Sequence, residues 1–322
     1  MDSIFNENSA QVKKYKQIKE IRSFSAGAGL CIIGFCIISE LIGIIVAVFG
    51  LQDLYYNNQL FYQCFSLVGT MLSICIPFLL MGSLFKKKTD IDIVPLGKPT
   101  NFRLAFLAVP AGVMLCLAGS MITAYLTMFL DAIGIKLSAP DMASPTGGYA
   151  LIIYMLRLTV SAAVMEEIVI RGVIMQPLRK YGNWFAILMS AMIFAFLHCN
   201  LIQAPFAFLA GIAIGYFTIV TGTVWTGIFI HLINNGISAI TAYYIAIGQE
   251  DKGNIIGSLL IYLMIALGII CLVAFRKARG SFSIDKKPLL TKGERAKAYL
   301  ITIPMIIAFA LICYYTHFYI EL

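Results

Sequence analysis

The feature that most constrains this chain is a succession of apolar runs, each long enough to cross a bilayer. About 20 predominantly apolar residues span roughly 30 Å of hydrocarbon. Backbone polar groups at that depth must be satisfied within the segment, which favours helices. The sequence therefore predicts an all-α, polytopic transmembrane helix bundle of about eight to nine spans. The nine runs are residues 25–51, 61–84, 104–130, 149–178, 183–200, 203–220, 223–247, 255–275 and 298–317.

Composition excludes an ordinary soluble protein, because 60% of the 322 residues are hydrophobic and only 12% are charged. The first 22 residues are polar and basic, and the first apolar run is too long for a cleavable signal peptide. The eight cysteines stand singly in apolar segments without CxxC spacing. We therefore expect them to act as small hydrophobic residues rather than as disulfides or thiolate metal ligands.

The basic residues predict the orientation of the chain. If the N-terminus is cytoplasmic, 20 of the 24 lysines and arginines fall in the segments predicted to lie inside, as the positive-inside rule requires. Orientation in a lipid bilayer thus accounts for the net charge of +8, and no nucleic-acid partner is needed to explain it. We therefore expect a multi-pass protein of the cell membrane with a cytoplasmic N-terminus.

Three ionisable residues lie close together in the apolar segment 161–180, namely Glu166, Glu167 and Arg171. Charges at membrane depth are costly and are usually buried inside the protein for a reason. On a helix, Glu167 and Arg171 are four residues apart and can pair, whereas Glu166 is turned by about 100°. The spacing thus predicts one paired carboxylate and one unpaired carboxylate, although a purely structural ion pair between helices remains an alternative.

Two of the three histidines also fall in apolar runs. His198 ends the fifth run, and His231 shares a helix face with Asn235 in the seventh. Counted from the predicted cytoplasmic ends, Glu166, His198, His231 and Asn235 lie at depths of about 12–22 Å, so a common site is possible. A carboxylate and an imidazole can activate a water, while a second imidazole and an amide can stabilise an oxyanion. Together, these residues could hydrolyse an amide bond without a covalent intermediate.

A metal is the alternative way to activate that water. Glu166, His198 and His231 could instead hold Zn²⁺, although the HExxH motif of zinc proteases is absent. The sequence therefore does not favour a particular cofactor, and zinc stays possible. Two further intramembrane charges, Glu40 and Arg157, either pair with each other or line a polar cavity, and we favour a structural role for them.

At these residues the chain resembles the CPBP family of intramembrane proteases, which includes the type II CAAX prenyl endopeptidases and the lysostaphin-resistance-protein-A-like proteins of bacteria. The EExxxR, FxxxH and HxxxN/D motifs that mark this family are intact and in order over roughly residues 150–245. They read Glu166, Glu167 and Arg171; Phe194 and His198; His231 and Asn235.

The resemblance implies an all-helical core with a cavity in the membrane that opens towards the cytoplasm. It also implies an intramembrane endopeptidase that cleaves a peptide or protein substrate, possibly a membrane-associated one. In that mechanism Glu166 and His198 activate water and His231 and Asn235 stabilise the oxyanion. Arg171 orients the glutamates, and Glu167 supports them. The family has been described both as metalloproteases and as metal-free glutamate proteases.

Two other functions remain open at this point. A non-catalytic immunity or scaffold protein of the same fold would use the polar layer structurally. A proton-coupled transporter would use Glu166, His198 and Glu40 as a relay, but no inverted repeat is evident. The predicted organisation has four parts. They are a basic cytoplasmic segment 1–24, transmembrane helices over 25–148, the catalytic core 149–247, and C-terminal helices over 248–322 with a basic loop 276–297.

Overall fold

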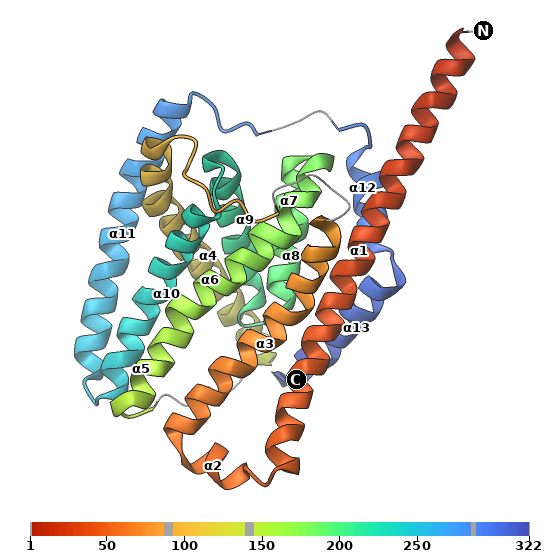
Figure 1. Ribbon diagram of the computed structural model, residues 1–322. Coiled ribbons are helices and arrows are strands. Elements are labelled where there is room, and N and C mark those ends of the chain that lie inside the picture. The colour runs from red at the N-terminus through yellow and green to blue at the C-terminus, as the bar shows by residue number, and fades with distance from the viewer. Residues whose placement is uncertain (1, 87–92, 139–144, 285–287, 322) are drawn as a thin grey trace.

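A computed structural model describes residues 2–86, 93–138, 145–284 and 288–321. Nearly all of these residues are helical, and Figure 1 shows the helices side by side in one bundle, with α11 and α1 at opposite edges. The first elements are α1 (Asp2–Val48), α2 (Gln52–Asn57), α3 (Gln59–Lys86), α4 (Phe102–Ala132) and β1 (Lys136–Leu137). A second group forms one nearly continuous helix: α5 (Gly148–Leu156), η1 (Arg157–Ser161), α6 (Ala162–Glu167), η2 (Ile168–Ile174), α7 (Met175–Leu178) and η3 (Arg179–Tyr181). The last are α8 (Asn183–Phe196), α9 (Ala204–Thr221), α10 (Val224–Ala246), α11 (Glu250–Arg279), α12 (Lys292–Leu300), α13 (Ile303–His317) and β2 (Ile320–Glu321).

The number of membrane crossings agrees with the sequence. Within the described residues, seven helices are long and apolar enough to cross a bilayer. The number of spans rises to eight if the bent pair α12–α13 is counted as one further span. The two helices of that pair meet at 71°. The predicted polytopic helix bundle is therefore confirmed. Helix α1 begins at Asp2, so it also includes most of the basic segment that precedes residue 25.

One predicted span is shorter than expected. Residues 183–200 were expected to cross the bilayer, but α8 is a helix of only 14 residues that ends at Phe196. The reason lies at Asn200, whose side chain accepts a hydrogen bond from the Gln203 amide and donates one to the His198 carbonyl. These bonds stabilise a turn, so the chain reverses into α9 before α8 reaches full length.

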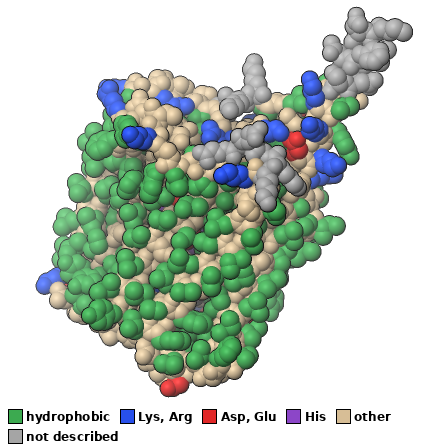
Figure 2. All heavy atoms as spheres, viewed as in Figure 1, with side chains coloured by type: hydrophobic (Ala, Val, Ile, Leu, Met, Phe, Trp, Pro, Cys, Tyr) green, Lys and Arg blue, Asp and Glu red, His purple; other side chains and the backbone are tan. Residues whose placement is uncertain are grey.

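The surface has the pattern of a membrane protein. Figure 2 shows hydrophobic side chains over most of the visible face, whereas lysines and arginines gather mainly at the end from which the N-terminal helix projects. Exposed leucines, isoleucines and phenylalanines occur along α1, α3, α4 and α11, where they would contact lipid. This separation of charge from apolar surface defines a multi-pass membrane protein.

Close packing holds the core around the polar residues. Helix α9 packs against α8 and α4, and α10 packs against α4, α6, η1 and α11. At Gly211 of α9 an added Cβ would lie 2.9 Å from the Ala191 Cβ, so only a glycine lets α8 approach this closely. A two-residue antiparallel pairing joins Lys136 to Glu321 and Leu137 to Ile320, and it ties β1 to the end of the chain.

Candidate active site

Two π-helical turns flank the residues that carry the site. The segment η1 precedes α6 and η2 follows it, so Glu166 and Glu167 end a short α-helix between two wider turns. Such π-turns interrupt the regular ladder of a helix and are frequent at functional sites. Here they determine how the side chains of α6 and η2 are directed towards α10.

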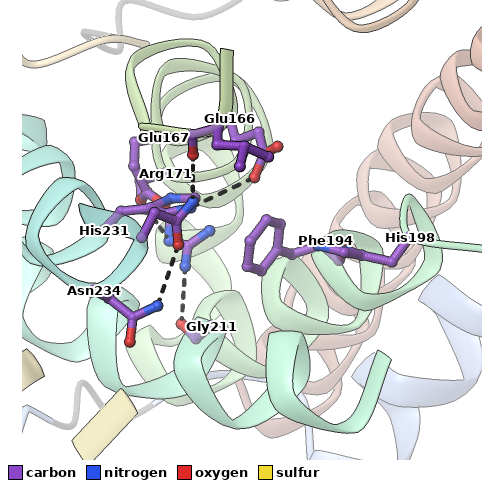
Figure 3. A network of polar contacts seen from close by, with 10 residues as sticks. Glu166, Glu167, Arg171, Phe194, His198, Gly211, His231 and Asn234 are labelled. Carbon is purple, nitrogen blue, oxygen red and sulfur yellow. Dashed lines mark hydrogen bonds and ion pairs between the residues drawn. The ribbon is translucent and has the colours of Figure 1, made fainter. Parts of the chain in front are cut away.

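Glu167 is the centre of a buried ion-pair network (Figure 3). Its Oε2 lies 3.0 Å from the Arg171 Nε, and both side chains are fully buried, which confirms the predicted pairing. Its Oε1 lies 2.9 Å from the Nδ1 of His231. A glycine makes room for this carboxylate, because a Cβ at Gly227 would lie 3.0 Å from the Glu167 Oε2.

The Arg171 guanidinium is held from two further sides. Its Nη2 lies 3.5 Å from the Gly211 carbonyl oxygen of α9, and its Cζ lies 4.9 Å from the centre of the Phe194 ring. A buried charge is tolerated only when it is paired and surrounded by favourable dipoles, and an aromatic face adds a cation–π attraction. Arg171 therefore fixes the position of Glu167 and links η2 to α8 and α9.

Glu166 faces the other side of the same histidine. Its Oε2 lies 3.8 Å from the His231 Nε2, and its side chain is 19% exposed, whereas Glu167 is completely buried. The imidazole thus lies between two carboxylates, one bonded to Nδ1 and one near Nε2. The distance of 3.8 Å is longer than a direct hydrogen bond. Glu166 is consequently the less constrained of the two acids.

His198 lies apart from this network. Figure 3 shows it on the far side of Phe194 from Glu167 and Arg171. Its Nδ1 is 2.9 Å from the Phe194 carbonyl oxygen. The Phe194 ring contacts both imidazoles edge to face, with centroid distances of 5.0 Å to His198 and 5.9 Å to His231. The two histidines are therefore separated by one aromatic ring, and of the two it is His231 that lies next to Glu166.

Asn235 is directed to the backbone. Its Nδ2 donates to the Leu158 carbonyl at 3.0 Å, and its Oδ1 accepts from Asn234 at 3.2 Å. The first bond attaches α10 to η1, one helical turn beyond His231. The structure thus brings Glu166, Glu167, Arg171 and His231 together, and it places Asn235 beside them with its amide already engaged.

The residues suggested for zinc do not form one ligand set. Phe194 lies between His198 and His231. Among the described parts of the chain, no group of three or more His, Cys, Asp or Glu side chains is placed to hold a metal ion. The arrangement therefore does not fit the zinc alternative, and we derive no step through a metal.

The two other intramembrane charges have separate environments. Glu40 hydrogen bonds the Tyr315 hydroxyl of α13. The Arg157 guanidinium of η1 lies 5.7 Å from the Tyr154 ring centre. Both contacts are consistent with the structural role that we expect for Glu40 and Arg157.

Sequence reasoning missed three contributors to the site, Gly211, Gly227 and Asn234. Gly227 carried a usable signal, because it precedes His231 by four residues and so lies on the same helix face. Asn234 is buried and hydrogen bonds its neighbour. The Gly211 carbonyl carried no signal, because its contact with Arg171 depends on how α9 packs.

The fold and this cluster define a multi-pass membrane protein with a buried carboxylate–imidazole site. Residues 148–237, from α5 into α10, match the family model described as Type II CAAX prenyl endopeptidase Rce1-like. This match covers the segment that carries the three motifs, and it supports their resemblance to the CAAX-type intramembrane proteases. No curated protein and no solved structure matches the chain. The family is one of proteases, so its substrates are peptides or proteins in a membrane environment.

Proposed function

We propose that this chain is an intramembrane endopeptidase that hydrolyses a peptide bond with water activated by Glu166. The observation that carries the proposal is the position of His231 between two carboxylates, Glu167 at Nδ1 and Glu166 near Nε2. A family match over the same residues supports it. We further propose that the protein lies in the cell membrane with its N-terminus in the cytoplasm and that its substrate is a membrane-associated peptide or protein.

In the proposed reaction, Glu166 accepts a proton from water while the water oxygen forms a bond to the carbonyl carbon. The carbonyl π electrons move to the oxygen, and this oxyanion accepts a hydrogen bond from the His231 Nε2–H. When the C–N bond breaks, Glu166 returns its proton to the leaving nitrogen. The role of His231 requires both of its ring nitrogens to carry a proton, because Glu167 accepts a hydrogen bond from Nδ1–H and the oxyanion accepts one from Nε2–H.

His198 and Asn235 keep supporting roles in this proposal. His198 assists Glu166 with the water, and Asn235 donates a second hydrogen bond to the oxyanion. His198 bonds the Phe194 carbonyl through Nδ1, and Asn235 bonds the Leu158 carbonyl through one N–H of its amide. The His198 Nε2 and the second amide N–H of Asn235 are the groups that would act in the reaction. Catalytic hydrogen bonds commonly form only in the complex with substrate.

The test is peptidase activity of the purified full-length chain in nanodiscs against a panel of fluorogenic peptides. Glu166→Gln should lower kcat by about 100- to 10,000-fold, the usual contribution of a general base, with little change in thermal stability. Glu250→Gln, at an exposed position at the start of α11, is the matched control and should retain full activity. Undiminished cleavage by the Glu166 variant would exclude the proposed role.

A second candidate is a non-catalytic membrane protein of the same fold. The observation in its favour is that Glu167 pairs with both Arg171 and His231 inside the bundle. Under this alternative the wild-type chain cleaves no peptide of the panel, and Glu166→Gln leaves its cellular phenotype unchanged. A parallel assay with a chelator, followed by added Zn²⁺, tests the metal alternative directly, because a metal-free protease keeps its activity.

A further inference from the structure

Two cysteine thiols meet where α1 passes the turn between α8 and α9. Cys36 lies on α1 and is buried, and Cys199 lies in the turn and is partly buried. Their thiols hydrogen bond each other, and both cysteines are free. Spacing along the chain gives no sign of this contact, because only the packing of distant segments creates it. Two sulfur atoms that a disulfide bond could join are therefore already neighbours.

Two other thiols of the bundle contact sulfur atoms of a different kind. The Cys31 Sγ lies 3.5 Å from the Met81 Sδ, and the Cys75 Sγ lies 3.3 Å from the Met165 Sδ. A thioether carries no S–H and cannot form a disulfide, so neither contact can become a cross-link. The contact between two thiols does have this capacity.

The backbone of the turn fixes the position of Cys199. Its φ is +53°, in the left-handed region that residues other than glycine rarely adopt. Such strain persists where the surrounding structure determines the conformation, and it is frequent at functional sites. The Asn200 side chain donates to the His198 carbonyl at 2.7 Å, and the Cys199 Sγ lies 3.5 Å from the Phe196 carbonyl oxygen. The turn therefore holds the thiol close to α1 before any reaction.

An acid and a phenol complete the surroundings of the pair. Glu40 follows Cys36 by one helical turn, so its carboxylate lies on the same face of α1. The Tyr315 hydroxyl of α13, a helix that packs against α1, donates a hydrogen bond to that carboxylate. A carboxylate beside a thiol can accept its proton and so produce the thiolate, which is the reactive form of cysteine. Glu40, which takes no part in the proposed hydrolysis, is therefore placed to activate Cys36.

The surface around Glu40 determines what kind of reagent reaches the pair. Glu40 is exposed, and its neighbours Ile37 and Leu41 on α1 are 53% and 48% exposed, as expected for a helix face that contacts lipid. A charged oxidant has little access to this depth. A quinone dissolves in the hydrocarbon core and accepts two electrons and two protons, which two thiols release when they form a disulfide.

We propose that Cys36 and Cys199 form a reversible dithiol–disulfide pair that a membrane-dissolved quinone oxidises. Glu40 accepts the proton of the Cys36 thiol. In the complete reaction two S–H bonds break and one S–S bond forms, while two electrons and two protons pass to the quinone, which becomes a hydroquinone. A small dithiol such as dithiothreitol reverses the reaction by disulfide exchange and is itself oxidised.

The disulfide would attach α1 covalently to the turn that carries His198. In the proposed hydrolysis His198 assists Glu166 with the water, so a fixed turn should hinder this step. We therefore expect the oxidised chain to be the less active form. This consequence rests on the proposed function, whereas the formation of the disulfide does not.

The test for the bond uses the purified full-length chain in nanodiscs, treated with a short-chain ubiquinone. Free thiols are then alkylated, and mass spectrometry of the digested chain identifies disulfide-linked peptides. We expect a linked pair that contains Cys36 and Cys199 and disappears with dithiothreitol. Cys36→Ser should abolish it, whereas Cys313→Ser, at an exposed position on α13, is the matched control and should keep it. Glu40→Gln should slow its formation by about tenfold or more.

Absence of this linked pair, or equal formation of pairs that contain other cysteines, would overturn the proposal. The consequence for activity is measured on the same samples with the fluorogenic peptides. The quinone should lower hydrolysis by the wild-type chain about tenfold or more, and dithiothreitol should restore it. An unchanged rate of the oxidised chain, or equal inhibition of Cys36→Ser, would overturn the regulatory role. If the reduced wild-type chain cleaves no peptide, the proposed function fails, and mass spectrometry still decides whether the disulfide forms.

Discussion

The candidate site has a buried half and an open half, and they are held in different ways. The buried half consists of Glu167, Arg171 and His231, whose side chains bind one another at 2.9 to 3.0 Å. The open half consists of Glu166, His198 and Asn235. The last two bond backbone carbonyls, and Glu166 is 3.8 Å from its nearest charged partner. The ion pairs of the first arrangement are formed before substrate arrives, whereas the second has free or exchangeable contacts.

This difference indicates that the two halves have separate roles in the proposed reaction. Groups that stabilise developing charge act best when they are already fixed, because no reorganisation is then needed. A residue that handles water must instead be accessible and able to change partners. In our proposal the buried half orients His231, and the open half meets the water and the peptide.

The largest effect should follow from breaking the buried half. Glu167→Ala leaves the Arg171 guanidinium buried without its acid and should destabilise the fold by about 3–5 kcal/mol, measured by chemical denaturation in mixed micelles. The double variant Glu167→Gln with Arg171→Met removes both charges and should recover part of this loss. If the single and double variants were equally unstable, the ion pair would not be what holds this half together.

A smaller effect should follow from crowding the same half. Gly227→Ala places a Cβ 3.0 Å from the Glu167 Oε2 and 2.9 Å from both Ile214 and Thr218, which should cost about 1–3 kcal/mol in stability and lower kcat. Gly236→Ala on the same helix meets nothing within 4 Å and should be neutral or stabilise by up to about 1 kcal/mol. Matching denaturation curves for the two variants would argue against a tight fit at Glu167.

The smallest effect should come from the open half. Asn235→Ala removes one hydrogen bond to the Leu158 carbonyl and should cost only about 1 kcal/mol in stability. Its effect on kcat should exceed its effect on stability if the amide moves to the oxyanion, and peptide hydrolysis alongside thermal unfolding measures both. A loss of activity that merely follows the loss of folded protein would restrict Asn235 to attaching α10 to η1.

The fold was predictable from sequence because a bilayer leaves the backbone few alternatives. Long apolar runs become helices, and α3, α4, α9, α10 and α11 begin and end within a few residues of the runs that predict them. The early end of α8 was not predictable from hydropathy, because the predicted run extends to residue 200. The hydrogen bonds of Asn200, which depend on the local turn, end it.

The site was predictable where it depends on one helix and not where it depends on helix rotation. The spacing of Glu167 and Arg171 was sufficient to predict their pairing. Depth in the membrane placed His198 and His231 in one layer, but depth does not determine which way a helix faces. The shared water of Glu166 and His198 therefore stays a prediction, whereas the position of Phe194 between the two histidines could not be read from depth.

The wide turns η1 and η2 place a limit on how this segment can change in length. Each π-turn holds one residue more than an α-helix would use, and removing a single residue would turn everything beyond it by about 100°. Such a deletion in η2 would carry Arg171 away from Glu167, and one in η1 would turn both glutamates away from α10. Between residues 157 and 174, the number of residues therefore determines the direction in which the site side chains point.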